Sequence, residues 1–531
     1  KTLDFFFEHR FNYISFWNGH PFPYFLRLTK YPEVKELSAA ELDRNIELMG
    51  WLSREAEKRN IWLLFHFYNI HVPRSFAEAH GIPRNRFFNG YTVSEPNPLV
   101  SDYTRYCIRE FISRYPSVGL YFPLGEALQK DKSYWMNEVL LAGVKDTGKT
   151  PPVILRQHDI GSVDVLEKAL AIYGNLYTEM KHNDELYTVP QPLPGNADWI
   201  KRSRRHIINV HLMGNIKPFR WAAPSFIRET AQAQQAMGAR GLQVYPLWVW
   251  NWPTSADSAR LLQIDRDWLW YAAWGRYACH ADRPNEREDE HWRNEIAAHY
   301  GAKAAPHVLA AYESAGRVMP WVPRLFWFRG WNHWFASNGL TLDQMLASNP
   351  YPFDNAPKTM RLSEYASLVA DGGSAEKGIL TPVEVTGEMV AQAQKAAESC
   401  RLAEPLVGMN HDEFARLKTD VEATWLIARF YQTKVEAAIR FVAYQKAHDA
   451  AHATRVLEAL RESVEIYRDL ASRTGKAYPV ANDIRNDMPF PFYPPTGIAP
   501  LEPHGIPHLP HWRDFLPVFE AELEMYQKLL Q

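Results

Sequence analysis

Cysteine is scarce in this chain of 531 residues. Its three cysteines, Cys107, Cys279 and Cys400, form no Cys-x-x-Cys pair and have no nearby histidine at a spacing typical of metal ligands. We therefore expect neither a disulfide framework nor a thiolate zinc site, and we interpret all three as small buried hydrophobic residues. Scarce cysteine leaves the compartment open, because large exported enzymes need no disulfides, and we favour the periplasm or the extracellular space over the cytoplasm.

Long apolar runs and a charge imbalance are also missing. The most apolar stretches, residues 61–67 and 242–252, are much shorter than the roughly 20 residues of a transmembrane helix, so we expect no membrane span. Lys and Arg total 59 against 61 Asp and Glu, which excludes a global field that would attract nucleic acid. No Gly-x-Gly-x-x-Gly or P-loop motif is present, and we expect no cofactor. The chain starts at Lys1 without a signal-type segment, and we interpret it as processed or trimmed.

Aromatic residues, in contrast, are abundant and make up 14% of the chain. Flat aromatic rings stack on the apolar faces of sugars, and the polar atoms of Trp and Tyr bond hydroxyl groups. A large core with a few exposed rings would give the same composition. Composition alone leaves both interpretations open.

Residues 1–282 alternate short apolar runs with longer amphipathic stretches, which is typical of βα units and a parallel sheet. One amphipathic stretch, residues 40–59, has Ser38 as its expected N-cap and Glu41 three positions later. The expected strands are 13–17, 61–67, 119–122, 153–156, 176–178, 207–210 and 242–245. These seven strands predict a TIM-type (β/α)8 barrel whose first strand precedes residue 1. An open doubly wound sheet is the alternative, but it lacks its usual glycine motif here.

Residues 283–531 change to a helical period and predict an all-α C-terminal domain. The expected helices are 286–300, 305–317, 386–402, 412–448, 453–474 and 512–530. Residues 478–511 are rich in proline and predict an ordered loop that folds over the barrel or a neighbouring subunit. We interpret His504, His508 and His511 as scattered loop histidines, not a metal site. A homodimer through the helical domain is the assembly that we consider.

Polar and aromatic side chains follow every predicted strand of the barrel. The carboxyl ends of parallel barrel strands meet at one rim, so the side chains there share a cavity. We therefore predict a ligand site at this rim. The candidate substrate-binding residues are Trp17, Asn18, His20, His66, Asn69, Arg156, His158, Lys181, His211, Asn215, Lys217, Arg220, Tyr245, Trp248 and Trp250.

Carboxylates, tryptophans and cations at this rim together suit carbohydrate chemistry. Glycoside hydrolysis needs one protonated carboxyl group and one ionised carboxylate across the glycosidic bond. Tryptophans, Trp221 and Trp252 included, would form the floors of sugar subsites, and Arg156, Lys181, Lys217 and Arg220 would attract the carboxylate of a uronic acid. The alternative for Arg156 and Lys217 is internal pairing with the same acids. The candidate catalytic acids are Glu126, Asp159, Glu179, Asp184 and Glu185.

Three segments resemble a known family: Gly125-Glu126, Asp159, and residues 178–187 after the sixth strand. They are similar to the α-glucuronidases of glycoside hydrolase families 67 and 115, which combine an α/β domain, a (β/α)8 barrel and a helical C-terminal domain. The resemblance implies bacterial degradation of a uronic-acid-containing polysaccharide or oligosaccharide. It implies Glu126 as the general acid, and Asp159 with Glu185 as activators of water in an inverting hydrolysis. Glu179 and Asp184 compete with Glu185 for the role of second carboxylate.

Three other functions are compatible with the same residues. A polysaccharide lyase would use Tyr68, His158 or His211 as the base beside a neutralised uronate carboxylate. A degenerate barrel would bind carbohydrate without turnover. A metal-dependent hydrolase or isomerase would need convergent histidine and carboxylate ligands, and we consider it the weakest alternative.

Overall fold

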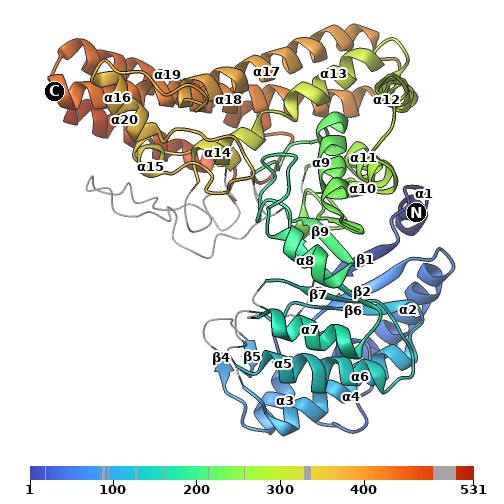
Figure 1. Ribbon diagram of the computed structural model, residues 1–531. Coiled ribbons are helices and arrows are strands. Elements are labelled where there is room, and N and C mark those ends of the chain that lie inside the picture. Colours follow the sequence, from blue (N-terminus) through green and yellow to red (C-terminus); the bar gives the residue numbers. More distant parts are fainter. Residues whose placement is uncertain are drawn as a thin grey trace. The chain divides into compact units, whose positions relative to one another are not determined.

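The computed structural model describes most of the chain (Figure 1). The described residues are 1–17, 19–67, 69–85, 90–93, 95–125, 128, 130–158, 160, 162–212, 215–255, 257–327, 336–481 and 510–531. They form two compact units. Unit 1 comprises Lys1–Met180, Gly195–Asn209 and Met237–Leu242, and unit 2 comprises Lys181–Pro194, Val210–Ala236 and Gln243–Gln531. The boundary at residue 282 stays a prediction, and the two units divide the chain at other positions.

A seven-stranded sheet organises unit 1. Its strands follow chain order and pair in parallel from β1 to β8, with partners such as His66 and Tyr121, or Arg156 and Glu179. The strands are β1 (Tyr13–Phe16), β2 (Trp62–His66), β6 (Val118–Phe122), β7 (Val153–Arg156), β8 (Leu176–Lys181), β9 (His206–Val210) and β10 (Gly241–Val244). All seven predicted strands are thereby confirmed. The structure shows a mixed α/β fold with a parallel sheet, and the closed eight-stranded barrel stays a prediction.

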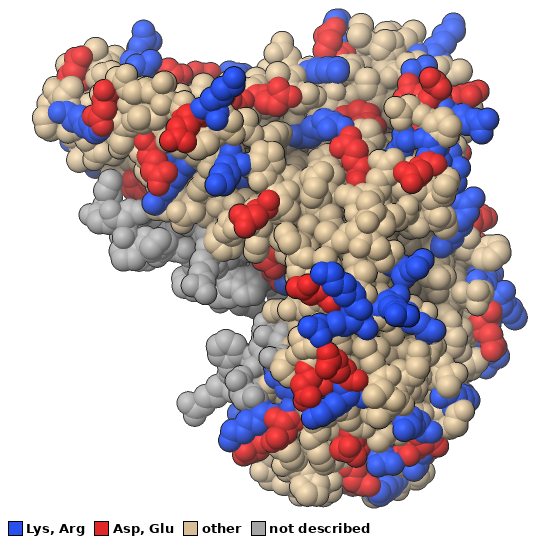
Figure 2. All heavy atoms as spheres, in the orientation of Figure 1, with Lys and Arg blue, Asp and Glu red and all other residues tan. Residues whose placement is uncertain are grey.

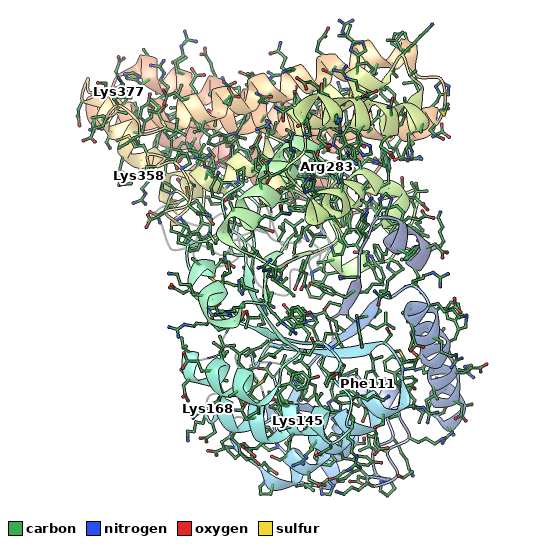
Figure 3. The ribbon with its side chains drawn as sticks, turned by 45° about the vertical axis from the view of Figure 1, so that its right-hand side comes forward. Phe111, Lys145, Lys168, Arg283, Lys358 and Lys377 are labelled. Carbon is green, nitrogen blue, oxygen red and sulfur yellow. The ribbon has the colours of Figure 1, made fainter. Side chains whose placement is uncertain are left out.

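Helices cover one face of this sheet, where α4, α5, α6 and α7 lie on the same side of the strands (Figure 1). Phe111 of α4 packs edge-on against Phe65 of β2 at 5.0 Å between ring centroids, in the layer that Figure 3 shows between the strands and these helices. The unit 1 helices are α1 (Thr2–Glu8), α2 (Ala39–Glu57), α3 (Arg74–Ala79), α4 (Pro98–Arg114), α5 (Lys132–Tyr134), α6 (Leu141–Lys145), α7 (Val163–Ile172) and α8 (Asn196–Ser203), with short helices η1 (Phe22–Tyr24) and η2 (Trp135–Leu140). The predicted capping box of α2 is confirmed, with Ser38 and Glu41 bonding each other's backbone N–H.

The other face of the sheet carries an apolar cluster of Leu64, Tyr121, Ile154 and Ile207, one from each of four strands. We call it the interior face. Both faces of the sheet are therefore apolar, which explains why the strands read as nearly continuous hydrophobic runs in the sequence. A small antiparallel sheet with the order β3 (His71–Val72), β5 (Gly90–Thr92) and β4 (Arg84–Asn85) was not predicted.

Unit 2 is helical, and its long helices α17, α18 and α19 run side by side (Figure 1). The helices predicted for the second half of the chain are confirmed, and Phe414, Leu417 and Phe430 on α18 are buried. Its helices are α9 (Pro224–Met237), α10 (Gln263–Arg266), α11 (Trp268–Cys279), α12 (Asn285–Tyr300), α13 (Ala305–Ala315), α14 (Val322–Leu325), α15 (Leu342–Ala347), α16 (Leu362–Ala370), α17 (Pro382–Ala403), α18 (His411–Ala447), α19 (Ala450–Thr474) and α20 (Trp512–Leu529), with short helices η3 (Val249–Asn251), η4 (Met319–Trp321) and η6 (Glu404–Leu406).

The core of unit 2 contains a buried ion network. Arg220 bonds Glu413 and Asp420 at 2.8 Å each and Asp257 at 3.4 Å. Arg266 bonds Asp257 at 3.0 Å and Asp267 at 2.6 Å, and its Nη2 donates to the Tyr478 hydroxyl at 2.7 Å. All three nitrogens of each guanidinium therefore have a partner. We define the ion network as Arg220, Asp257, Arg266, Asp267, Glu413, Asp420 and Tyr478.

Two sequence predictions need correction or limits. Cys107 and Cys400 are buried, but Cys279 is exposed, because it is the last residue of α11. Most of the proline-rich loop 478–511, with His504 and His508, lies outside the described residues. Within the described ranges, no helix combines the length and apolarity that a membrane span requires.

Candidate active site

Polar side chains form a layer on the interior face of unit 1, two residues beyond an apolar side chain on each of the strands β2, β7, β8 and β9. His66 follows Leu64 and Asn209 follows Ile207 at this spacing, and side chains two positions apart in a strand share a face. Each side chain of this layer is at most 2% exposed. We define the polar layer as His66, Arg156, Glu179 and Asn209.

Glu179 is the carboxylate of this layer, and its two oxygens differ. Oε2 accepts a hydrogen bond from the Tyr121 hydroxyl at 2.5 Å and lies 3.5 Å from Nε of Arg156. Among the described residues, none donates a hydrogen bond to Oε1. Glu179 is therefore held at one oxygen by a charge-assisted contact and a short hydrogen bond, while the other oxygen is left for a further donor.

Stacked rings complete the surroundings of Glu179. The His66 ring stacks on Tyr121 at 3.9 Å with an interplanar angle of 9°, and it contacts Trp17 at 4.7 Å. The Arg156 guanidinium lies 5.5 Å from the Trp17 ring. Each of five side chains therefore contacts the next in a closed ring, which we call the circuit: Glu179, Tyr121, His66, Trp17 and Arg156. Burial first, and the charge of Arg156 second, lower the pKa of His66 well below 6.5, so the imidazole is neutral at pH 7. Trp17 is 43% exposed, which leaves its ring accessible as a stacking platform.

Three predicted residues, Asn18, Glu126 and Asp159, lie outside the described residues. Gly125 is described, with a φ of +83°, and a Cβ there would lie 2.0 Å from the Asn69 amide oxygen. Only glycine fits this position without a shift. Asn69 is itself buried, so the loops after β2 and β6 pack against each other in unit 1.

Other predicted residues of unit 1 have structural contacts. Nε2 of His20 and the Tyr103 hydroxyl form a hydrogen bond of 2.8 Å, and burial, followed by the charge of His71, lowers the pKa of His20 to about 3. His158 is half-buried after β7. The structure thus brings Trp17, His66, Arg156 and Glu179 together and does not bring His20 into their circuit.

A further set of predicted residues belongs to unit 2. Lys181 pairs with Glu185 at 2.8 Å and with Asp184 at 3.3 Å. His211 and Tyr245 are both buried, with ring centroids 4.3 Å apart. Lys217 and Trp248 are buried, whereas Trp250 is 51% exposed.

Two unit 2 residues proposed to bind sugar have their polar groups occupied by protein. The Asn215 amide donates to the carbonyls of Tyr187 and Met319 and accepts from the Tyr187 N–H. Arg220 belongs to the ion network. Trp221 is also a core residue, 5.4 Å from Trp270, and donates to the Gly316 carbonyl. The expected sugar floor at Trp221 is therefore wrong, because the ring is buried among other aromatic rings.

Sequence reasoning missed two residues of this site, Tyr121 and Asn209. Both lie inside predicted strands, whereas the predicted site residues lie mainly just after the strands. Asn209 is a polar residue within the apolar run Ile207–Val210, and that exception to the pattern was an available signal. The described residues contain no group of three His, Cys, Asp or Glu side chains that could bind a metal ion.

Comparisons with known proteins were made by sequence and by structure. No protein-family model matches the chain, and no curated protein matches it. Solved structures do match, and they show that the chain has the fold of a glycoside hydrolase. One of them is a GH138 enzyme targeting pectin rhamnogalacturonan II. The alignment with it covers 100% of this chain, with 30% identity and a TM-score of 0.86, and this chain spans 63% of the matched structure's length.

Two other solved structures are more distant. A family 89 glycoside hydrolase from Clostridium perfringens, in complex with PUGNAc, matches 88% of this chain and 51% of its own, at 11% identity and a TM-score of 0.49. CpGH84B matches 89% of this chain and 70% of its own, at 10% identity and a TM-score of 0.41. The match to the GH138 enzyme supports the predicted class, glycoside hydrolase, while the specific resemblance to families 67 and 115 is not shown.

Proposed function

We propose that this chain is the catalytic part of a glycoside hydrolase that cleaves a uronic-acid-containing polysaccharide or oligosaccharide at the polar layer. The observation that carries the proposal is the similarity over the whole chain, at 30% identity, to an enzyme that targets pectin rhamnogalacturonan II. We further propose that the seven strands belong to a (β/α)8 barrel, whose strand ends form the active site. The α-glucuronidase-like and inverting character is part of this proposal.

Glu126 is the proposed general acid, and Glu179 the proposed second carboxylate. A second carboxylate must be ionised and must present one oxygen to water or to the sugar. The Oε2 of Glu179 is held by Tyr121 and Arg156, and Oε1 has no donor among the described residues. Glu185 fits this role less well, because its Oε1 lies 2.8 Å from the Lys181 ammonium. Asp159 stays a candidate.

We propose that single buried cationic side chains bind the uronate carboxylate. On the face that Figure 2 shows, cationic and anionic side chains are intermixed, so no broad basic surface gathers acidic glycans there. Arg156 combines burial with contacts to Glu179 and Trp17, and a guanidinium matches a carboxylate in shape and charge. Internal pairing of Arg156, the alternative to sugar binding, is present, and we propose that it coexists with substrate binding. Trp17 would stack on the sugar.

The test is incubation with uronic-acid-containing glycans and their reduced, uncharged counterparts, with assays for reducing ends and ultraviolet absorbance. We expect new reducing ends from the charged set alone, without an unsaturated product. Glu126→Gln and Glu179→Gln should each lower kcat by about 10²- to 10⁴-fold. Asp164→Asn, an exposed acid paired with Lys168 on α7, is the matched control and should leave kcat unchanged.

Three results would contradict the proposal. An ultraviolet-absorbing product would indicate a lyase, and saturable binding without turnover would indicate a binding protein. A larger loss in Glu185→Gln than in Glu179→Gln would move the second carboxylate to Glu185.

A further inference from the structure

Asn209 is buried, and neither polar atom of its side chain has a hydrogen-bond partner in the part of the chain that the structure describes. Its side chain is fully buried, and neither Nδ2 nor Oδ1 forms a hydrogen bond with any described residue. A buried amide without partners costs free energy, because it has lost its hydrogen bonds to water. Such a group in a native interior calls for an explanation, and a ligand that supplies the partners is one.

The strand geometry shows which way Asn209 faces. Ile207, two residues earlier on β9, packs in the apolar cluster with Leu64 and Tyr121. His206 faces the opposite side, where Nδ1 bonds Thr178 at 2.9 Å and Nε2 bonds Asn196 at 2.8 Å. Asn209 therefore shares the interior face with Ile207. It lies on the strand next to β8, which carries Glu179.

Two other polar-layer atoms also lack partners among the described residues: Nδ1 of His66 and Oε1 of Glu179. Three strands thus direct one unsatisfied polar group each to the same face of the sheet. An amide offers two donor hydrogens and an acceptor oxygen, a neutral imidazole offers a donor or an acceptor, and a carboxylate accepts. A sugar hydroxyl both donates and accepts, so adjacent ring hydroxyls match this set.

We propose that Asn209 is a specificity-determining residue that binds a ring hydroxyl of the sugar held at Glu179. This inference rests on the proposed function, because the ligand is taken to be a sugar. A site built to bond a hydroxyl rejects the analogue that lacks it, since the buried polar group is then left unpaired. Asn209 would therefore select the sugar by the pattern of its hydroxyl groups, while a cationic side chain binds the carboxylate of the sugar.

The first experiment measures the thermal unfolding of Asn209→Leu, which keeps the branching at Cγ and removes both polar atoms. If a ligand is the partner of the amide, the free protein loses no hydrogen bond, and its melting temperature should stay within about 1 °C of the wild-type value or rise. Asn183→Leu is the matched control. Asn183 is equally buried, but its amide bonds the carbonyls of His182 and Gln191 and the N–H groups of Thr188 and Val189, so its melting temperature should fall by several degrees. A comparable fall in Asn209→Leu would overturn the proposal.

The second experiment compares 4-nitrophenyl glucuronide and galacturonide with their 2-, 3- and 4-deoxy analogues. We expect Asn209→Leu to lower kcat/KM by about 100-fold on a cleaved parent, and to cause no further loss on the one analogue that lacks the bonded hydroxyl. Equal losses on the parent and on every analogue would overturn the proposal.

A wild-type protein that cleaves neither glycoside would count against the proposed function, and binding then tests Asn209 separately. Calorimetry with glucuronic and galacturonic acid should show weaker binding to Asn209→Leu than to wild type, by about tenfold or more. Equal affinity of the two proteins, or no binding to either, would overturn the proposal for Asn209.

Discussion

The polar layer of unit 1 and the ion network of unit 2 differ in how completely their buried polar groups are hydrogen-bonded. In the ion network, every guanidinium nitrogen of Arg220 and Arg266 has a partner, and the Tyr478 hydroxyl donates to Asp420 at 2.6 Å. In the polar layer, His66, Glu179 and Asn209 each keep an atom without a partner among the described residues. Burial and polarity are similar, but hydrogen bonding is more complete in the ion network, where one buried atom, Oδ2 of Asp267, has no partner among the described residues.

This difference separates structural from functional polarity. A buried network in which nearly every polar atom is hydrogen-bonded fixes how segments distant in sequence pack, and here it joins Arg220 to Asp420 across 200 positions. An unsatisfied group lowers the stability of the free protein and is retained where a ligand completes its bonds. The comparison predicts that mutations of the ion network act on stability and that mutations of the polar layer act on catalysis.

The largest expected effect on stability comes from Asp420→Asn. It removes the charge that faces Arg220 and leaves a buried guanidinium poorly compensated, so the free energy of unfolding should fall by about 3–5 kcal/mol. Urea denaturation measures this loss, and kcat per folded molecule should be unchanged. Asp289→Asn, which breaks an exposed pair with Arg293 on α12, is the control and should cost at most about 0.5 kcal/mol. An equal loss in the free energy of unfolding for Asp420→Asn and Asp289→Asn would contradict the structural role of the ion network.

His206 lies on the same strand as Asn209, but both of its ring nitrogens are hydrogen-bonded. It therefore tests whether hydrogen bonding, and not position in the sheet, determines that a buried polar side chain contributes to stability. Burial lowers the pKa of His206 to about 4, below the ordinary 6.5. The folded protein therefore favours the neutral imidazole of His206. The contribution of His206 to the free energy of unfolding is fully present above pH 6.5 and is lost as the pH falls toward 4. The loss amounts to about 3 kcal/mol at pH 4.

The variant His206→Gln isolates this contribution. The stability difference between wild type and His206→Gln should shrink as the pH is lowered from 7 to 4.5, as measured by melting temperature at each pH. The exposed His280→Gln should keep a constant difference from wild type. A difference for His206→Gln that does not change with pH would argue against a buried neutral imidazole.

Tyr121→Phe should give the smallest effect, and it tests the one hydrogen bond that joins the apolar cluster to Glu179 of the polar layer. Phenylalanine keeps the stack on His66 but removes the hydrogen bond to Glu179, so kcat should fall by about tenfold with little change in KM. Tyr173→Phe is the matched control, because the buried Tyr173 hydroxyl bonds the Pro151 carbonyl elsewhere in unit 1. Tyr173→Phe should lower stability and leave kcat unchanged, and a reversal of these two results would contradict the assignment.

The fold was largely predictable because local patterns dictate it. Short apolar runs between amphipathic stretches located all seven strands, and Ser38 with Glu41 located the start of α2. The site was less predictable, because it depends on which face each strand residue occupies. Asn209 and Tyr121 were missed for this reason, although the period of two within a strand places both. The pairing of Arg220 with Asp420 joins residues too far apart in sequence for any local pattern to indicate.

The two-residue spacing between the apolar cluster and the polar layer has an evolutionary consequence. Ile207 packs in the apolar cluster, whereas the polar atoms of Asn209 have no partner among the described residues, although the two are neighbours on one face of one strand. Selection can therefore replace polar-layer residues one at a time without loss of the sheet, because each replacement leaves the apolar cluster beneath it intact. Related chains can in this way diverge in the polar layer and still inherit the same scaffold.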